Sequence, residues 1–132
     1  MTANELKIGN LVYFKHCDYD STIPRKVELV QNPNLLGLEK IAVNQIEFNH
    51  VEPIPLTEEW LLNFGFTLCE NAAWYEKKIP TLGIVVSCNL HGRFCIEHTD
   101  EIVTIRDCCY KVHELQNLYF ALVREELTFK LE

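Results

Sequence analysis

Two cysteines and two histidines recur at short spacing in the second half of the chain, in the order Cys88, His91, Cys95 and His98. Thiolates and imidazoles are side chains that zinc accepts, and this C-x2-H-x3-C-x2-H pattern is the nearest the chain comes to a metal site. If His91 and Gly92 form a hairpin turn, Cys88 and Cys95 oppose each other on one sheet face, and His98 points to the other. Four ligands then cannot converge, so we expect paired core thiols, no bound metal and no cofactor.

Two further clusters carry side chains of the kinds used in catalysis: His16-Cys17-Asp18-Tyr19-Asp20 and the adjacent pair Cys108-Cys109. Neighbouring residues of one loop rarely aim at one point, and a catalytic Cys and His normally come from distant parts of a sequence. The first cluster is therefore interpreted as a solvated loop. Adjacent cysteines strain a disulfide, so we expect one buried and one exposed thiol at the second.

The common catalytic and phosphate-binding motifs are absent. The sequence contains no G-x-S-x-G, no Walker A loop, no G-x-G-x-x-G and no H-E-x-x-H. Its five glycines are isolated, and each is explained by a turn or a helix cap. We therefore expect a protein that is not an enzyme.

The charge balance bears on the class of partner. Nineteen acidic residues against twelve basic ones give a net charge of −7, and the basic residues form no stripe. Nucleic-acid binding draws most of its affinity from neutralised phosphates, so this class is disfavoured. A basic protein partner fits an acidic surface better.

The overall composition indicates one domain with one core. The chain has 132 residues, of which 48% are hydrophobic and 23% charged. No signal-like start and no apolar run of about 20 residues is present, which predicts a cytoplasmic protein without a membrane partner. Free thiols are then expected at all six cysteines: Cys17, Cys69, Cys88, Cys95, Cys108 and Cys109.

Residues 1–55 are expected to form a β-rich lobe. Turn signals, among them Asn32-Pro33-Asn34, separate short β-leaning runs at 6–15, 26–30, 36–43 and 49–54. Strands this short and this close predict a small, strongly curled sheet, similar to an SH3-type barrel. Residues 56–132 form the second lobe of the same domain, after the stiff segment Pro53-Ile54-Pro55.

A short capped helix is predicted within residues 55–66. Thr57 can accept a hydrogen bond from a free amide of the first turn, and Gly65 supplies a left-handed residue after the last. Phe66 then falls where such a cap returns an apolar side chain to Leu61. The buried face is expected to contain Trp60, Leu61 and Phe64.

The rest of the second lobe is predicted to be an antiparallel meander followed by a helix packed on it, which makes the fold class α+β. The strands are expected at 68–75, 83–89, 93–99 and 102–106, with turns at 90–92 and 100–101. Helical periodicity runs from Val112 to about Glu126. Its core stripe is Leu115, Leu118, Tyr119, Leu122 and Val123, and an alternating tail at 127–131 is expected to end as a short strand.

The apolar face of that second helix is wider than docking on one sheet requires, because Phe120, Val123 and Leu127 form a further flank. Either the first lobe or the tail at Phe129 and Leu131 covers this flank, or it meets a second copy across a two-fold axis. Of the two we favour a homodimer through the helix.

Three segments together resemble a known group of proteins: Glu5-Leu6-Lys7-Ile8-Gly9-Asn10-Leu11-Val12, the stretch from Ile54 to Leu61 with Phe64-Gly65-Phe66, and the stretch from Val112 to Leu122. The set resembles a family of small uncharacterised proteins from gut Bacteroidetes, their phages and other mobile elements. The chain departs from that family at Val123-Arg124, where members often have Thr-Gly. The resemblance implies a phage or mobile-element accessory protein and carries over no site residue.

These observations favour a non-enzymatic binding protein that contacts a host or phage protein, as an anti-defence inhibitor would. One alternative is a small-ligand binder that sequesters a nucleotide signal between the two lobes with cations such as Arg25, Arg93 or Arg106. A second alternative is nucleic-acid binding by the barrel-like first lobe.

Overall fold

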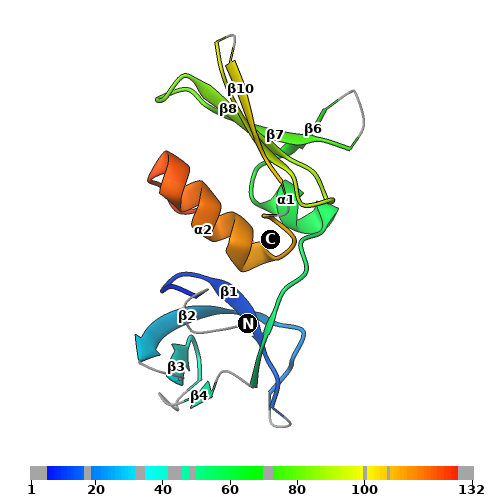
Figure 1. Ribbon diagram of the computed structural model, residues 1–132. Helices are drawn as coiled ribbons and strands as arrows, with labels where there is room; N and C mark the ends of the chain where they lie inside the picture. The colour runs from blue at the N-terminus through cyan, green and yellow to red at the C-terminus, as the bar shows by residue number, and fades with distance from the viewer. Residues whose placement is uncertain are drawn as a thin grey trace. The chain divides into compact units, whose positions relative to one another are not determined.

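The computed structural model describes residues 6–16, 19–31, 35–41, 46–47, 50–69, 73–99, 101–106 and 108–127. The fold is α+β, as predicted, with two five-stranded antiparallel sheets and two helices among these residues (Figure 1). The chain divides into two compact units. Unit 1 comprises residues 1–55 and 111–117, and unit 2 comprises 56–110 and 118–132. The boundary at residue 55 follows the proline segment, whereas the helix that the sequence assigned to the second lobe is shared by both units.

Unit 1 contains a curled sheet that forms half a barrel, which confirms the expected first lobe. Its strands follow the order β4-β3-β2-β1-β5, and a register shift between Val27 and Leu29 bends β2. β4 was not predicted, because two residues are too few to show a pattern. The bounds are β1 Leu11–Phe14, β2 Pro24–Gln31, β3 Leu35–Leu38, β4 Ile46–Glu47 and β5 Val51–Pro53.

The core of unit 1 is apolar and closed by a helix. Its buried cluster includes Leu6, Val12, Phe14, Val27, Leu38, Ile41, Ile46 and Val51. Gln116, in the first half of helix α2 (Val112–Val123), is 2% exposed; its Oε1 accepts from the Leu11 N–H at 2.8 Å and its Nε2 donates to the Gly9 carbonyl at 3.2 Å. Gly9 lies in a turn, with φ of 98°.

Unit 2 begins with helix α1 (Glu58–Asn63), which has the predicted caps. The Thr57 side chain accepts from the Trp60 N–H, and Gly65 has φ of 92°. The N–H groups of Gly65 and Phe66 donate to the carbonyls of Leu62 and Leu61, each at 3.0 Å. The expected buried face is confirmed, since Trp60, Leu61, Phe64 and Phe66 are all buried.

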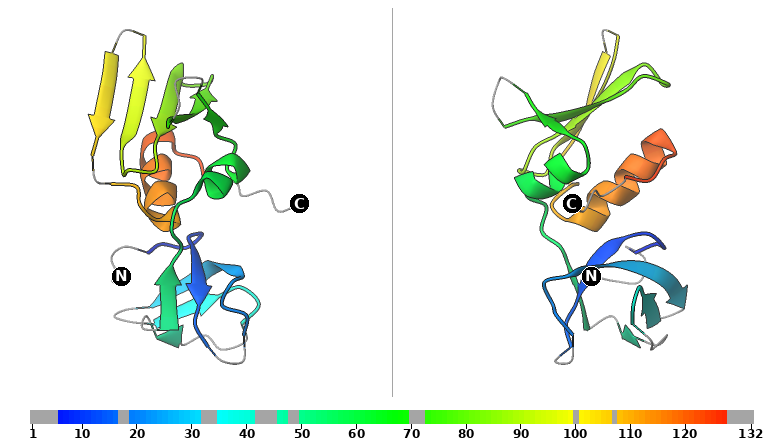
Figure 2. Two further views of the ribbon diagram at one scale, coloured as in Figure 1. Left: turned by 90° about the vertical axis from the view of Figure 1, so that its right-hand side faces the viewer. Right: turned by 180° about the vertical axis from the view of Figure 1, so that it is seen from behind.

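The sheet of unit 2 is a meander in the order β10-β9-β8-β7-β6, with β10 at one edge (Figure 2). The strand predicted at 68–75 is wrong. Ala73 has φ of 83°, which no extended strand accommodates, so the chain forms two separate strands there. The bounds are β6 Thr67–Leu68, β7 Tyr75–Ile79, β8 Ile84–Cys88, β9 Phe94–His98 and β10 Glu101–Ile105.

Polar contacts tie both helices to this sheet. The Tyr75 hydroxyl donates to the Glu58 carboxylate, and this bond raises the pKa of Tyr75 to about 12. Lys77 donates from Nζ to the Phe64 carbonyl at 2.9 Å, and its Nζ lies 5.5 Å from the centroid of the Tyr119 ring. The second half of α2 is thereby placed against β7.

Helix α2 ends three residues earlier than predicted, at Val123 instead of Glu126. Arg124 has φ of 67°, and its N–H donates to the Phe120 carbonyl at 2.8 Å, which closes the last turn. Leu127 therefore lies outside the helix. Val123 and Leu127 are each 5% exposed, and Phe120 is 39% exposed. The chain itself thus covers two of the three residues of the flank on which the homodimer was predicted.

The predicted tail strand at 127–131 lies largely outside the described residues, as does the turn at 32–34. Neither of the helices in the described part of the chain is long and apolar enough to cross a membrane.

Candidate functional site

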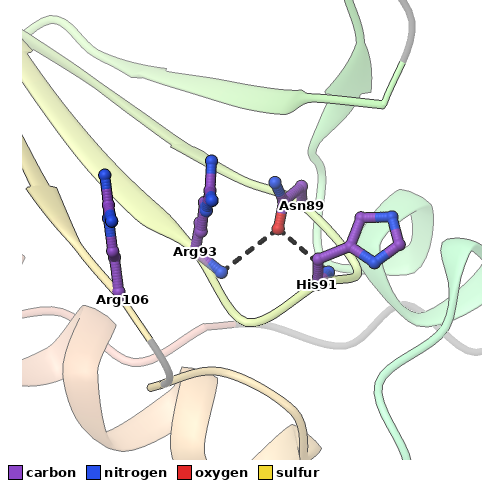
Figure 3. A pocket seen from close by; sticks show the side chains of 4 residues that line it. All are labelled: Asn89, His91, Arg93 and Arg106. Atoms are coloured by element: carbon purple, nitrogen blue, oxygen red, sulfur yellow. Dashed lines mark hydrogen bonds between the residues drawn. The ribbon is translucent and has the colours of Figure 1, made fainter.

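A polar pocket of about 420 Å³ lies within unit 2 and is lined by Asn89, His91, Arg93 and Arg106. Figure 3 shows their side chains following one another in the order Arg106, Arg93, Asn89, His91. Three of them come from the loop between β8 and β9, and Arg106 follows the last residue of β10. The volume falls within the range of small-ligand sites, and all four side chains carry nitrogen donors that can bind an anion.

Asn89 stabilises the loop that carries His91 and Arg93. Its side chain is buried, and Oδ1 accepts from the His91 N–H at 2.9 Å and from the Arg93 N–H at 3.1 Å. The Asn89 N–H donates in turn to the Arg93 carbonyl at 3.1 Å. An Asn side chain that caps two backbone amides in this way replaces backbone pairing and fixes a compact turn.

Gly92 fastens the same loop to the chain that follows β10. Its carbonyl accepts from the Cys108 N–H at 3.0 Å. Its φ is 82°, and a Cβ added there would lie 2.3 Å from Cζ of Tyr110. Only glycine satisfies both the left-handed backbone and this approach, so the loop is held between Asn89 and the Tyr110 ring.

The two arginines adjoin the same end of the β9–β10 pair. The register of the two strands ends at the pair Phe94 and Ile105; Arg93 directly precedes Phe94, and Arg106 directly follows Ile105. Figure 3 shows both side chains pointing the same way. In the described part of the chain no carboxylate forms an ion pair with either one. Two like charges close together repel each other, and an anion bound between them removes that cost.

The four side chains proposed as weak zinc candidates do not converge. β8 pairs Cys88 with Phe94 and Ser87 with Cys95, so Cys88 and Cys95 lie on opposite sheet faces. The expectation that they oppose each other on one face is wrong, because the Asn89 turn spans five residues instead of two and moves the register by one. Among the described residues no group of three or more His, Cys, Asp or Glu side chains is placed to share a metal ion.

The thiols differ in their surroundings. Cys88 is fully buried; burial, with the nearby thiols of Cys108 and Cys95, raises the pKa of Cys88 to about 12. Cys95 Sγ lies 3.3 Å from Thr104 Oγ1 on the opposite face. Cys109 is buried and Cys108 half-buried, close to the expectation of one buried and one exposed thiol.

The loop from His16 forms a stack of rings in unit 1. The ring centroid of His16 lies 5.6 Å from that of Phe14 and 5.7 Å from that of Tyr19, and the Arg25 guanidinium lies 5.5 Å from the Tyr19 centroid. Cys17 and Asp18 lie outside the described residues. Arg25 is 7% exposed and is not among the residues that line the pocket.

The sequence thus identified both arginines as candidate ligand cations and His91 as a metal candidate, but it missed Asn89. The signal was present in Asn89-Leu90-His91-Gly92, since an Asn followed by a turn ending in Gly is typical of a side-chain-capped loop. What no pattern showed was that Arg106, thirteen residues beyond Arg93, completes the same site.

Comparison with known proteins gives no match, either to a family model, to a curated protein or to a solved structure.

Proposed function

We propose that this protein is a binding protein without catalytic chemistry, and that the unit 2 pocket takes an anionic group of a small ligand, such as the phosphate of a nucleotide. The observation that carries the proposal is the pair Arg93 and Arg106, whose side chains point the same way and line a pocket of about 420 Å³ with Asn89 and His91 (Figure 3). Guanidinium groups bind phosphate oxygens through paired N–H donors, and two of them side by side fit one phosphate group.

The arrangement supports binding better than reaction. Asn89 uses its carbonyl oxygen to cap the loop, and the remaining lining side chains are two arginines and a histidine. Among the described residues no carboxylate or nucleophile lines the pocket, and a pocket lined by arginines suits retention of an anion. With the resemblance to phage and mobile-element proteins, sequestration of a phosphorylated signal is the role we propose.

The test is a thermal-shift and calorimetric titration with AMP, ATP and cyclic di-GMP, with adenosine as the uncharged comparison. We expect the phosphorylated probes alone to stabilise the protein, by about 2.7 kcal/mol at a hundred times the dissociation constant. Arg93→Ala and Arg106→Ala should each weaken binding about tenfold to a hundredfold, the value of a charge-assisted hydrogen bond.

Lys78→Ala is the matched control, because Lys78 is an exposed cation on the same sheet outside the pocket. It removes the same charge and should leave binding unchanged. Each arginine variant should also melt at the same temperature as the ligand-free wild type or slightly above it, since it relieves a like-charge pair. Equal responses to adenosine and AMP, or equal losses in Lys78→Ala and Arg93→Ala, would reject the proposal.

A further inference from the structure

Asn89 presents its amide nitrogen to the pocket as a hydrogen-bond donor. Its Oδ1 accepts from the backbone N–H groups of His91 and Arg93, so the amide cannot turn around without losing both bonds. The side chain is 6% exposed and lines the pocket. In the part of the chain that the structure describes, Nδ2 makes no hydrogen bond. This nitrogen is therefore available to a ligand that accepts hydrogen bonds.

The Asn89 nitrogen continues a line of donors that the two arginines begin. Figure 3 shows the guanidinium ends of Arg106 and Arg93 and the nitrogen of Asn89 one after another, pointing to the same side, whereas the His91 ring turns away from them. We call Arg106, Arg93 and Asn89 the donor row. Arginine has no acceptor, and the acceptor of Asn89 is engaged by the loop. The donor row therefore offers donors alone.

A row that only donates fits a group that only accepts. The edge of a nucleobase such as adenine presents a donor beside an acceptor, and an asparagine pairs with it through both ends of its amide. Asn89 cannot pair in this way, because its Oδ1 is used within the loop. Phosphate oxygens are acceptors and carry negative charge, which suits the two guanidinium groups.

The extent of the donor row indicates more than one phosphate group. Two guanidinium groups suffice for a single phosphate, which would leave the Asn89 nitrogen unused. At roughly 30 Å³ per water, the pocket volume of about 420 Å³ corresponds to about fourteen waters, which is more space than one phosphate fills. A second phosphoryl group joined to the first would extend along the row to Asn89.

We propose that the donor row binds a diphosphate group, in which Arg106 and Arg93 hold one phosphoryl group and Asn89 Nδ2 donates to the other. This inference rests on the proposed function of the pocket and adds the class of its ligand, a diphosphate or a nucleoside diphosphate that is recognised without its base. Asn89 is then the residue that distinguishes a diphosphate from a monophosphate.

The experiment compares inorganic phosphate with pyrophosphate by calorimetric titration, in a buffer without divalent cations. The wild type should bind pyrophosphate about tenfold to a hundredfold more tightly, the value of one further charge-assisted hydrogen bond. ADP and GDP should bind with dissociation constants within about threefold of each other, because the donor row pairs with no base edge.

The higher charge of pyrophosphate also favours its binding, so two matched variants isolate the contribution of the donor. Asn89→Asp keeps an oxygen that caps the loop and replaces the nitrogen with an acceptor, so it should reduce the preference for pyrophosphate to within about threefold. Leu90→Asp adds the same charge at the next residue, which is 41% exposed and outside the pocket lining. It should keep the preference of the wild type.

A readout on the wild type requires no substitution. The side-chain amide signals of Asn89 in a two-dimensional NMR spectrum should shift on saturation with pyrophosphate and much less on saturation with phosphate. This measurement applies even if Asn89→Asp lowers the stability of the loop.

The outcomes separate this inference from the function of the pocket. An equal preference for pyrophosphate in Asn89→Asp and Leu90→Asp, equal shifts of the Asn89 signals with both anions, or ADP and GDP affinities more than about tenfold apart would overturn the diphosphate inference. Binding of AMP would still stand in each of these cases. If AMP, phosphate and pyrophosphate all fail to bind the wild type, the function of the pocket is rejected, and the diphosphate inference with it.

Discussion

Gly92 shows how a single residue determines the shape of the candidate site. Its left-handed backbone turns the β8–β9 loop, and the absence of a side chain lets the Tyr110 ring pack against it. His91 and Arg93 flank it, so their positions depend on this approach. The placement of both candidate ligand-binding residues thus depends on a residue without a side chain.

Gly92→Ala should lower both stability and ligand binding. A Cβ at 2.3 Å from Tyr110 must displace the ring or the loop, and overpacking together with the left-handed backbone costs about 2–5 kcal/mol. Chemical denaturation and AMP titration measure the two effects.

Gly83→Ala is the matched control for this change. Gly83 also has a positive φ, of 65°, but nothing lies within 4 Å of an added Cβ. Gly83→Ala should lower the free energy of unfolding by only about 1–2 kcal/mol and leave AMP binding unchanged. If the two variants lose equal stability and equal affinity, the contact with Tyr110 does not shape the pocket.

At the scale of elements, helix α2 supplies side-chain hydrogen-bond partners for backbone groups near the start of β1. Gln116 accepts from the buried Leu11 N–H and donates to the half-buried Gly9 carbonyl, and the neighbouring Asn117 accepts from Asn10 Nδ2 at 2.8 Å. The helix therefore completes the hydrogen bonding of the chain that enters β1. These two partners explain why a glutamine is buried in this helix.

Gln116→Leu should destabilise the protein although it adds apolar surface. It leaves the buried Leu11 N–H unpaired, at about 1–3 kcal/mol, and removes the donor to the half-buried Gly9 carbonyl, and together these losses exceed what the added burial offsets. Urea denaturation followed by circular dichroism measures the loss.

Asn63→Leu provides the comparison in helix α1. The side chain of Asn63 is half-buried, and its amide makes no hydrogen bond to any described residue. Asn63→Leu should therefore change the free energy of unfolding by no more than about 0.5 kcal/mol. A Gln116→Leu variant as stable as Asn63→Leu would mean that water satisfies the Leu11 and Gly9 groups instead.

For the whole molecule, we expect the helix that is shared by the two units to couple their folding. Residues 112–117 of α2 belong to unit 1 and the residues from Leu118 onward to unit 2. A helix of twelve residues is marginal by itself in water, so each half depends on the packing of its own unit and on continuity with the other half. Loss of either unit should therefore weaken the other.

The two tryptophans, Trp60 and Trp74, both lie in unit 2 and report on it alone. Val27→Ala creates a cavity in the core of unit 1, where Val27 is fully buried, and should cost about 2 kcal/mol. We expect the tryptophan fluorescence midpoint to fall with the circular dichroism midpoint, by about 6 °C.

Val86→Ala, at a fully buried position of unit 2, is the control. It should lower both the tryptophan fluorescence midpoint and the circular dichroism midpoint, because the cavity lies in the unit that contains the tryptophans. If Val27→Ala splits the circular dichroism transition in two while the fluorescence midpoint stays in place, the units unfold independently and the shared helix does not couple them.

The sequence by itself determined the features whose partners lie within a few residues. The caps of α1 followed from Thr57, Gly65 and Phe66, because each hydrogen bond of the cap joins residues at most five apart. The α+β class and the curled first sheet followed from alternation and turn residues in the same way. Such local preferences act before any tertiary contact forms.

Tertiary structure decided the register of Cys88, the end of α2 and the partnership of Arg93 with Arg106. The Asn89 side chain lengthened a turn that the residue types alone leave undetermined, and a shift of one residue transfers every side chain to the other sheet face. The cover over Val123 and Leu127 likewise depends on what packs against them. Packing and strand pairing join residues distant in sequence, and their free energies select among local alternatives that are nearly equal within the chain alone.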